Sequence, residues 1–96
     1  MTTNITPYTC TICPDAQPQL DVLAETARER VMAAVHGRAQ RLGQNHKDAS
    51  DMDLWKNGVI TTQDVREDRL KIFFNESNRN RHLELLSVEP FPAEYM

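Results

Sequence analysis

Two cysteines three positions apart, Cys10 and Cys13, are the residues of this 96-residue chain whose spacing most directly suggests chemistry. Two thiolates at this spacing can bind one Zn²⁺ at about 2.3 Å. Histidine completes many such sites, and His36 and His46 are the first two of the three histidines that follow in the sequence. The candidate zinc ligands are therefore Cys10, Cys13, His36 and His46, or four cysteines pooled by a dimer. The simpler interpretation, which we favour, is a pair of reduced thiols without a metal.

The six residues from Tyr8 to Cys13 resemble the opening of a Cys₂His₂ zinc finger, in which an aromatic residue stands two positions before the first cysteine. The resemblance ends there, because a finger requires a histidine about twelve residues after the second cysteine, and this chain has Thr26 at that place. A Cys-x-x-Cys pair is also typical of thiol redox proteins, where it lies between a strand and a helix N-terminus. We predict no strand with a parallel partner before the pair, so a thiol redox protein is only an alternative.

Other catalytic motifs are missing from the sequence, which has no phosphate-binding loop, dinucleotide fingerprint or nucleophile elbow. The three glycines are too scattered to form a phosphate cradle. A cysteine nucleophile needs a base beside it, and the sequence places none of the three histidines there. A chain of this size also leaves little room for a deep pocket. We therefore expect that the protein is not an enzyme.

Basic residues cluster at two places, one in a predicted helix and one in a polar stretch between two predicted strands. They are Arg30, Arg38 and Arg41 in the helix and Arg79 and Arg81 in the stretch. Arginine can contact phosphates and base edges, so the candidate nucleic-acid contacts are Arg38, Arg41, Arg79 and Arg81. The charge sum of 11 − 14 = −3 weighs against binding along an extended phosphate backbone. Nucleic acid is therefore the less favoured partner.

Aromatic side chains near the two ends of the chain are the expected anchors for a protein partner, namely Tyr8, Phe91 and Tyr95. Aromatic residues contribute much of the energy of an interface when a partner buries them. The polar rim of that interface would come from the arginines of the predicted helix, Arg30, Arg38 and Arg41. The expected partner is a larger protein or a second copy of this chain.

The elements that would position these residues are one long helix, one short helix and a few strands. Apolar residues at spacings of three and four predict an amphipathic helix over residues 19–43. A capping serine followed by acidic residues predicts a short helix over 50–58. β-Branched and apolar runs predict short strands at 59–62, 70–74 and 83–88. A helix from Thr62 to Phe73 is the alternative for part of this region.

We therefore predict an α+β fold, with the helices packed on an antiparallel sheet of two or three strands. The domain covers residues 19–89. Three of the five prolines lie before it, and proline removes donors and disfavours helix, so residues 1–18 are expected to form an extended arm that carries the cysteine pair. Residues 90–96 contain the other two prolines and are expected to form an extended tail.

The composition is that of a soluble globular domain, with a mean hydropathy of −0.59 and no apolar run near the ~20 residues that span a bilayer. The N-terminus lacks the features of a secretion signal, so we expect a cytoplasmic protein without a membrane partner. The function that fits is a small non-catalytic interaction or regulatory protein, such as a phage-type accessory or inhibitor protein. The alternatives are a zinc-stapled nucleic-acid-binding transcriptional regulator and a thiol redox protein.

Overall fold

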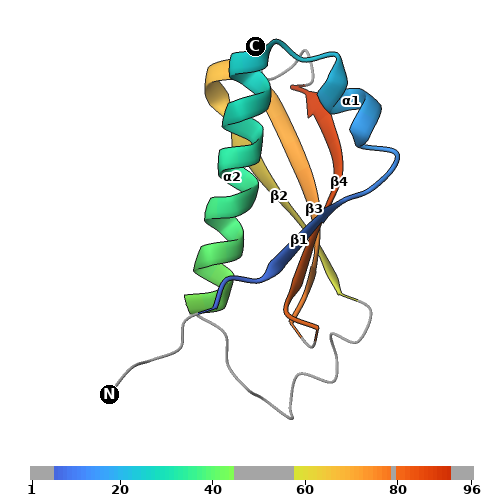
Figure 1. The fold of residues 1–96 in the computed structure, drawn as a ribbon. Coiled ribbons are helices and arrows are strands. Elements are labelled where there is room, and N and C mark those ends of the chain that lie inside the picture. The colour runs from blue at the N-terminus through green and yellow to red at the C-terminus, as the bar shows by residue number, and fades with distance from the viewer. Residues whose placement is uncertain (1–5, 45–57, 79, 92–96) are drawn as a thin grey trace.

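The computed structural model describes residues 6–44, 58–78 and 80–91. Their elements are β1 (Thr9–Ile12), α1 (Gln17–Asp21), α2 (Glu25–Gln44), β2 (Val59–Val65), the 3₁₀ turn η2 (Arg66–Asp68), β3 (Leu70–Ser77) and β4 (His82–Pro90). The strands form one mixed sheet in the order β1-β4-β3-β2, and α2 stands along one side of it (Figure 1). The described residues therefore make a two-layer α+β arrangement.

The antiparallel part of the sheet comes from segments that follow one another in the chain. β2 pairs with β3, and β3 pairs with β4. Both connections end in an arginine with a positive φ, 55° at Arg69 and 51° at Arg81, which turns the backbone sharply. The alternative helix over residues 62–73 is wrong, because these residues belong to β2, η2 and β3.

The predicted N-terminal arm contains a fourth strand. β1 lies parallel to β4, with Thr9 opposite His82 and Ile12 opposite Leu85. The expectations of an extended arm and of a two- or three-stranded antiparallel sheet are therefore wrong. The partners Thr9 and His82 are 73 positions apart, and local periodicity carries no information about a partner at that separation.

The single helix predicted for residues 19–43 is two helices in the structure. α1 ends at Asp21 and α2 begins at Glu25, with a corner between them at which Val22 is 83% exposed. Arg28 stabilises this corner, because its Nε donates to the Leu20 carbonyl and its Nη2 to the Leu23 carbonyl, each at 3.2 Å. The Leu20 carbonyl also accepts from the Leu23 N–H at 3.1 Å, so the end of α1 is held by both backbone and side chain.

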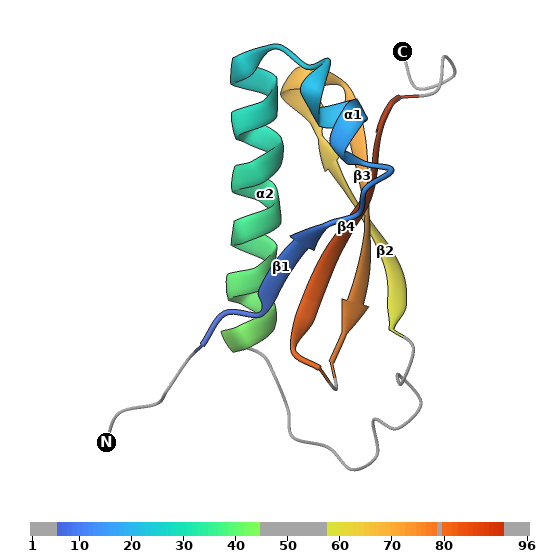
Figure 2. The same cartoon turned by 45° about the vertical axis from the view of Figure 1, so that its right-hand side comes forward.

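The hydrophobic core fills the space between α2 and one face of the sheet. Helix α2 contributes a buried stripe of Ala27, Val31, Val35 and Ala39. The sheet contributes Val65, Leu70, Ile72, Phe74, Leu83, Leu85 and Val88, and Leu20 of α1 belongs to the same cluster. Both helices therefore lie on one side of the sheet, as Figure 2 also shows. We call this side the covered face.

The other side of the sheet, the open face, carries no helix among the described residues. Its side chains alternate with those of the core along each strand, and they include Thr9, Thr11, Thr62, Asp64, Lys71, Phe73, Asn75, His82 and Glu84. The short helix predicted over 50–58 and the tail beyond Phe91 lie outside the described residues. Neither α1 nor α2 combines the length and the hydropathy that crossing a bilayer requires.

Candidate functional site

An imidazole held between two hydroxyls lies on the open face, where β1 meets β4. Thr9 and Thr11 are two residues apart on β1, so both side chains leave the same face of the sheet. His82 begins β4 directly opposite Thr9. Thr9 Oγ1 is 2.6 Å from His82 Nδ1, and Thr11 Oγ1 is 2.8 Å from His82 Nε2. We call these three residues the Thr–His–Thr cluster.

The neutral ring of His82 carries one hydrogen, so one ring nitrogen donates to its threonine hydroxyl and the other accepts from its threonine hydroxyl. The Thr9 hydroxyl donates to the Arg81 carbonyl at 3.3 Å, and a hydroxyl has only one proton. When that proton goes to the carbonyl, Thr9 accepts from Nδ1 and the ring hydrogen is on Nδ1. In this tautomer Nε2 keeps its lone pair and can accept from the Thr11 hydroxyl. The cluster thus has the order hydroxyl, base and orienting group that is found in proton-transfer sites.

Arg81 immediately precedes His82 in the chain, and its side chain is directed toward Tyr8 and Thr6. Its Nη2 donates to the Thr6 carbonyl at 3.0 Å, and its guanidinium carbon is 5.6 Å from the centre of the Tyr8 ring. Tyr8 is 4% exposed, and Asn78 donates to its hydroxyl at 3.1 Å. Burial raises the pKa of Tyr8, against the opposing influence of Arg81. Tyr8, expected to contact a partner, therefore lies in the core and supports Arg81.

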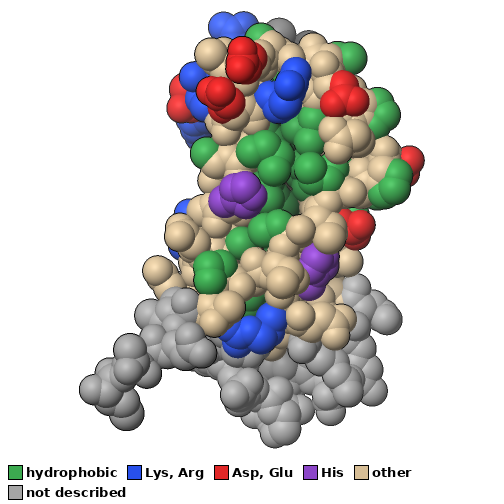
Figure 3. All heavy atoms as spheres, in the orientation of Figure 1, with side chains coloured by type: hydrophobic (Ala, Val, Ile, Leu, Met, Phe, Trp, Pro, Cys, Tyr) green, Lys and Arg blue, Asp and Glu red, His purple; other side chains and the backbone are tan. Residues whose placement is uncertain are grey.

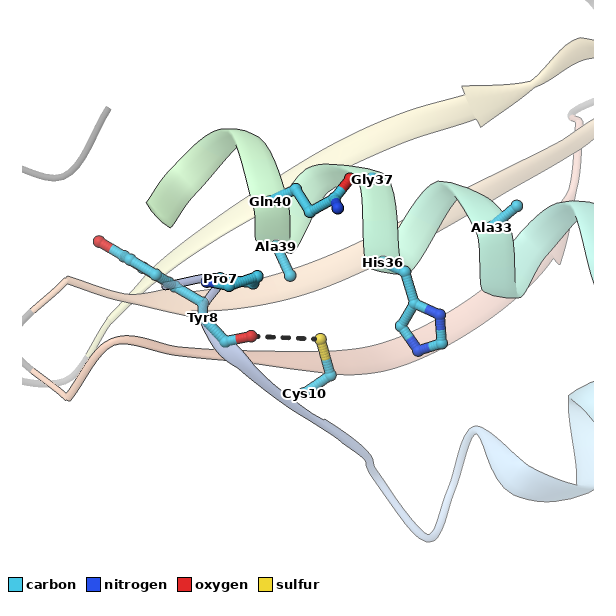
Figure 4. A pocket seen from close by; sticks show the side chains of 8 residues that line it. All are labelled: Pro7, Tyr8, Cys10, Ala33, His36, Gly37, Ala39 and Gln40. Atoms are coloured by element: carbon cyan, nitrogen blue, oxygen red, sulfur yellow. Dashed lines mark hydrogen bonds between the residues drawn. The ribbon is translucent and has the colours of Figure 1, made fainter. Parts of the chain in front are cut away.

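A hollow lies on the opposite side of β1, between that strand and α2. It measures about 390 Å³ and is lined by Pro7, Tyr8, Cys10, Ala33, His36, Gly37, Ala39 and Gln40. Figure 4 shows the Cys10 thiol and the His36 ring both directed into the space between the strand and the helix. The thiol donates to the Tyr8 carbonyl at 3.8 Å, and burial raises its pKa. Burial thus disfavours the thiolate, which is the form that metal binding and thiol exchange use.

The predicted zinc ligands are only partly brought together. Cys10 and His36 line the hollow, whereas Cys13 follows β1 and donates its backbone N–H to the Leu85 carbonyl at 2.9 Å. Within residues 6–44, 58–78 and 80–91, no three histidine, cysteine or acidic side chains gather closely enough to hold a metal ion. His46 lies outside these ranges.

Arg38, one of the arginines expected to contact a partner or nucleic acid, connects α2 to the sheet. Its Nε donates to a carboxylate oxygen of Glu76, which also accepts from Thr61 Oγ1 at 2.8 Å. The guanidinium carbon lies 5.3 Å from the centre of the buried Phe74 ring. This arginine therefore covers the end of the core.

The other two arginines of α2 also bind across to the sheet layer. Arg30 makes a two-pronged contact with Asp68, at 2.7 Å from Nε and 2.8 Å from Nη2. This contact holds the pKa of Asp68 below its usual range and raises that of Arg30. Arg41 Nη2 donates to Gln63 at 3.4 Å. The basic arc of the helix is therefore engaged within the chain.

The remaining candidates lie near the ends of strands. The Phe91 backbone N–H donates to the Arg69 carbonyl at 2.9 Å, and its side chain is half-buried. Arg79 and Tyr95 lie outside the described residues. Sequence reasoning missed Thr9 and Thr11 as members of a site. Their one-in-two spacing was visible, but nothing in the sequence placed His82 beside them.

Comparison with known proteins gives a likeness of fold. No protein-family model matches the chain, and no curated protein sequence matches it. Among solved structures, the intact E. coli RelBE toxin-antitoxin complex matches with a TM-score of 0.63 and 13% identity over 88% of this chain and 98% of that chain. The isolated E. coli RelE toxin matches with a TM-score of 0.59 and 13% identity over 92% and 90% of the two chains. The RelBE2 toxin-antitoxin complex of Mycobacterium tuberculosis matches with a TM-score of 0.61 and 15% identity over 93% of this chain and 97% of that chain.

These matches correct two expectations about function. The solved chains with this fold are toxins, so the prediction of a small non-catalytic interaction or regulatory protein, such as a phage-type accessory or inhibitor protein, is wrong. The prediction that the protein is not an enzyme is overturned with it. Neither a zinc-stapled regulator nor a thiol redox protein gains support from any of the matched structures. Across about nine-tenths of its length, the chain has the fold of the RelE toxins.

Proposed function

We propose that this chain is the toxin of a toxin–antitoxin pair and that its target is RNA. The observation that carries the proposal is the likeness of fold, which extends over nearly the whole of both chains and includes toxins crystallised alone and with their antitoxins. A fold can serve several functions, so the argument also requires a suitable site on this chain.

RNA is the target that suits the chemistry of the open face. RNA carries its own nucleophile, the ribose 2′-hydroxyl, so an enzyme that cleaves it needs a positioned base and a nearby positive charge. The Thr–His–Thr cluster offers the base, and Arg81 offers the charge. Most of the open face is less suited to phosphate, because Asp64 and Glu84 outnumber Lys71. RNA would therefore contact the end of the sheet where β1 meets β4.

A protein antitoxin is the second part of the proposal. Hydrophobic side chains gather on the surface between α2 and α1 (Figure 3). The hydrophobic residues that pack against the core and remain partly exposed include Ile12, Cys13, Leu23 and Met32. Apolar surface of this kind is suited to burial by a partner. An antitoxin bound there would have to extend past β1 to cover the Thr–His–Thr cluster.

Inducible expression in a bacterial culture tests the proposal. Induction of the wild-type chain is expected to stop growth and to produce new RNA 5′ ends, detected by primer extension. The purified protein is expected to cleave RNA, alone or with added ribosomes. A culture that accumulates folded protein, grows normally and retains intact RNA would overturn the proposal.

A further inference from the structure

We infer that His82 is the catalytic base of this chain, with Nε2 as the atom that takes the proton and Thr9 as the residue that positions the ring. The inference rests on the proposed action on RNA and names the residue that would perform it. The observation behind it is the pair of short contacts from the two threonine hydroxyls to the two ring nitrogens.

The strand pairing explains why the ring is held in one orientation. The parallel register sets Thr9 opposite His82 and Thr11 opposite Glu84, so the two hydroxyls bracket the imidazole along β1. The backbone of β1 is fixed in turn, because the Tyr8 N–H donates to Ala39 of α2 at 3.1 Å and the Thr9 N–H to Arg81 at 3.0 Å. A base held this way loses little freedom when the reaction begins.

The Thr11 hydroxyl marks the place that a substrate hydroxyl would take. Thr11 is exposed, and with the ring hydrogen on Nδ1 its hydroxyl donates to Nε2 at 2.8 Å. Rotation of this side chain about Cα–Cβ would free Nε2 for a ribose 2′-hydroxyl at the same hydrogen-bond distance. Thr9 would meanwhile keep its bond to Nδ1, so the ring would not turn.

The reaction balances with water as the only other reactant. His82 Nε2 takes the proton of the 2′-hydroxyl, the 2′-oxygen forms a bond to phosphorus, and the bond from phosphorus to the 5′-oxygen breaks. The 5′-oxygen takes a proton from water, and the imidazolium returns its proton to the hydroxide. The products are a 2′,3′-cyclic phosphate and a 5′-hydroxyl.

Three variants separate a catalytic from a structural role. His82→Asn retains a donor toward Thr9 but has no base at Nε2, and it is expected to lower the rate of RNA cleavage by about 10²–10⁴-fold. Thr9→Val removes the acceptor that orients the ring, and a loss of about tenfold is expected, together with a changed pH–rate profile. Thr62→Val changes an exposed threonine of β2 that also lies on the open face of the sheet but outside the cluster, and it is the matched control.

Nitrogen-15 NMR of the imidazole provides a readout that does not depend on activity. Histidine in water prefers the tautomer with hydrogen on Nε2, whereas His82 is expected to carry it on Nδ1 in the wild type and to lose this preference in Thr9→Val. Hydrogen on Nε2 in the wild type would overturn the inference. So would an active wild type whose His82→Asn variant cleaves RNA within threefold of its rate. A wild type that neither cleaves RNA nor stops growth contradicts the proposed function instead.

Discussion

The two faces of the sheet use polar residues in opposite ways. On the covered face, Arg38 bonds to Glu76 across the layer boundary, and the core beneath contains side chains with no exposure at all, such as Phe74. On the open face, the hydroxyls of Thr9 and Thr11 surround a half-buried histidine and remain exposed. One strand, β1, contributes to both, because its residues alternate between the two.

This difference separates the charged groups that hold the fold together from those available for chemistry. The arginines of α2 formed the more conspicuous pattern in the sequence, yet they bind within the chain. The threonines on β1 formed no conspicuous pattern, yet they lie at a site with an accessible base. The position of a polar side chain relative to the covering helix therefore says more about its role than its charge does.

The largest expected effect is in the covered core. Phe74→Ala removes a ring with 0% exposure, and such truncations cost about 3–5 kcal/mol. Its neighbour Phe73 is on the open face and half-buried, so Phe73→Ala should cost less than half as much. Urea denaturation of both variants measures the difference. Equal losses would show that the open face is also covered.

A smaller loss is expected at the contact between α2 and the sheet. Arg38→Met leaves Glu76 without its ion pair and should lower the free energy of unfolding by about 1–2 kcal/mol. Arg38→Met combined with Glu76→Gln should recover part of this loss, because no carboxylate is then left unpaired. Thermal unfolding of the single and double variants tests the coupling. A strictly additive double variant would contradict it.

Two glycines of α2 should respond with opposite signs. A Cβ on Gly43 would lie 2.2 Å from the Thr6 carbonyl oxygen, whereas one on Gly37 would meet only Arg41 Nη1 at 3.8 Å. Gly43→Ala must displace the backbone that leads into β1 and should be destabilising. Gly37→Ala should stabilise by about 0.5–1 kcal/mol through helix propensity. Parallel denaturation curves compare them, and two shifts of the same sign would contradict the close approach at Gly43.

The smallest effect is expected at the exposed pair of Arg30 and Asp68. Because the folded chain lowers the pKa of Asp68, the stabilisation from the pair is complete above the unfolded pKa of 3.8 and is lost as the pH falls through the folded value. Arg30→Gln should therefore be slightly less stable than the wild type at pH 7, and the gap should narrow at pH 3. Melting temperatures at the two pH values measure this. A difference in melting temperature between the two proteins that increases at pH 3 would contradict this prediction.

Local patterns accounted for the elements that pair with their neighbours. The runs at 70–74 and 83–88 became β3 and β4, and the apolar stripe with Val31 and Val35 became the buried side of α2. The break before Glu25 was not predictable from periodicity, because the spacing of apolar residues continues across it. Arg28 makes that break favourable through two tertiary contacts.

The candidate site was out of reach for a related reason. Prolines and threonines near the N-terminus indicate an extended chain, and β1 is indeed extended, but extension does not reveal a partner strand. His82 lies just before the strand predicted at 83–88, in a polar stretch that the sequence indicates to be a turn. In the structure it is the first residue of β4. The cluster forms because β1 pairs with β4. The conformational preferences of single residues do not predict which strands pair.

The parallel pairing of β1 with β4 has a consequence for folding during translation. During translation β1 is synthesised well before β4. Thr9 and Thr11 are therefore present before His82 has been added to the chain. Pairing between strands so far apart in sequence cannot form until both strands are present. The Thr–His–Thr cluster can therefore form only after β4 has been synthesised.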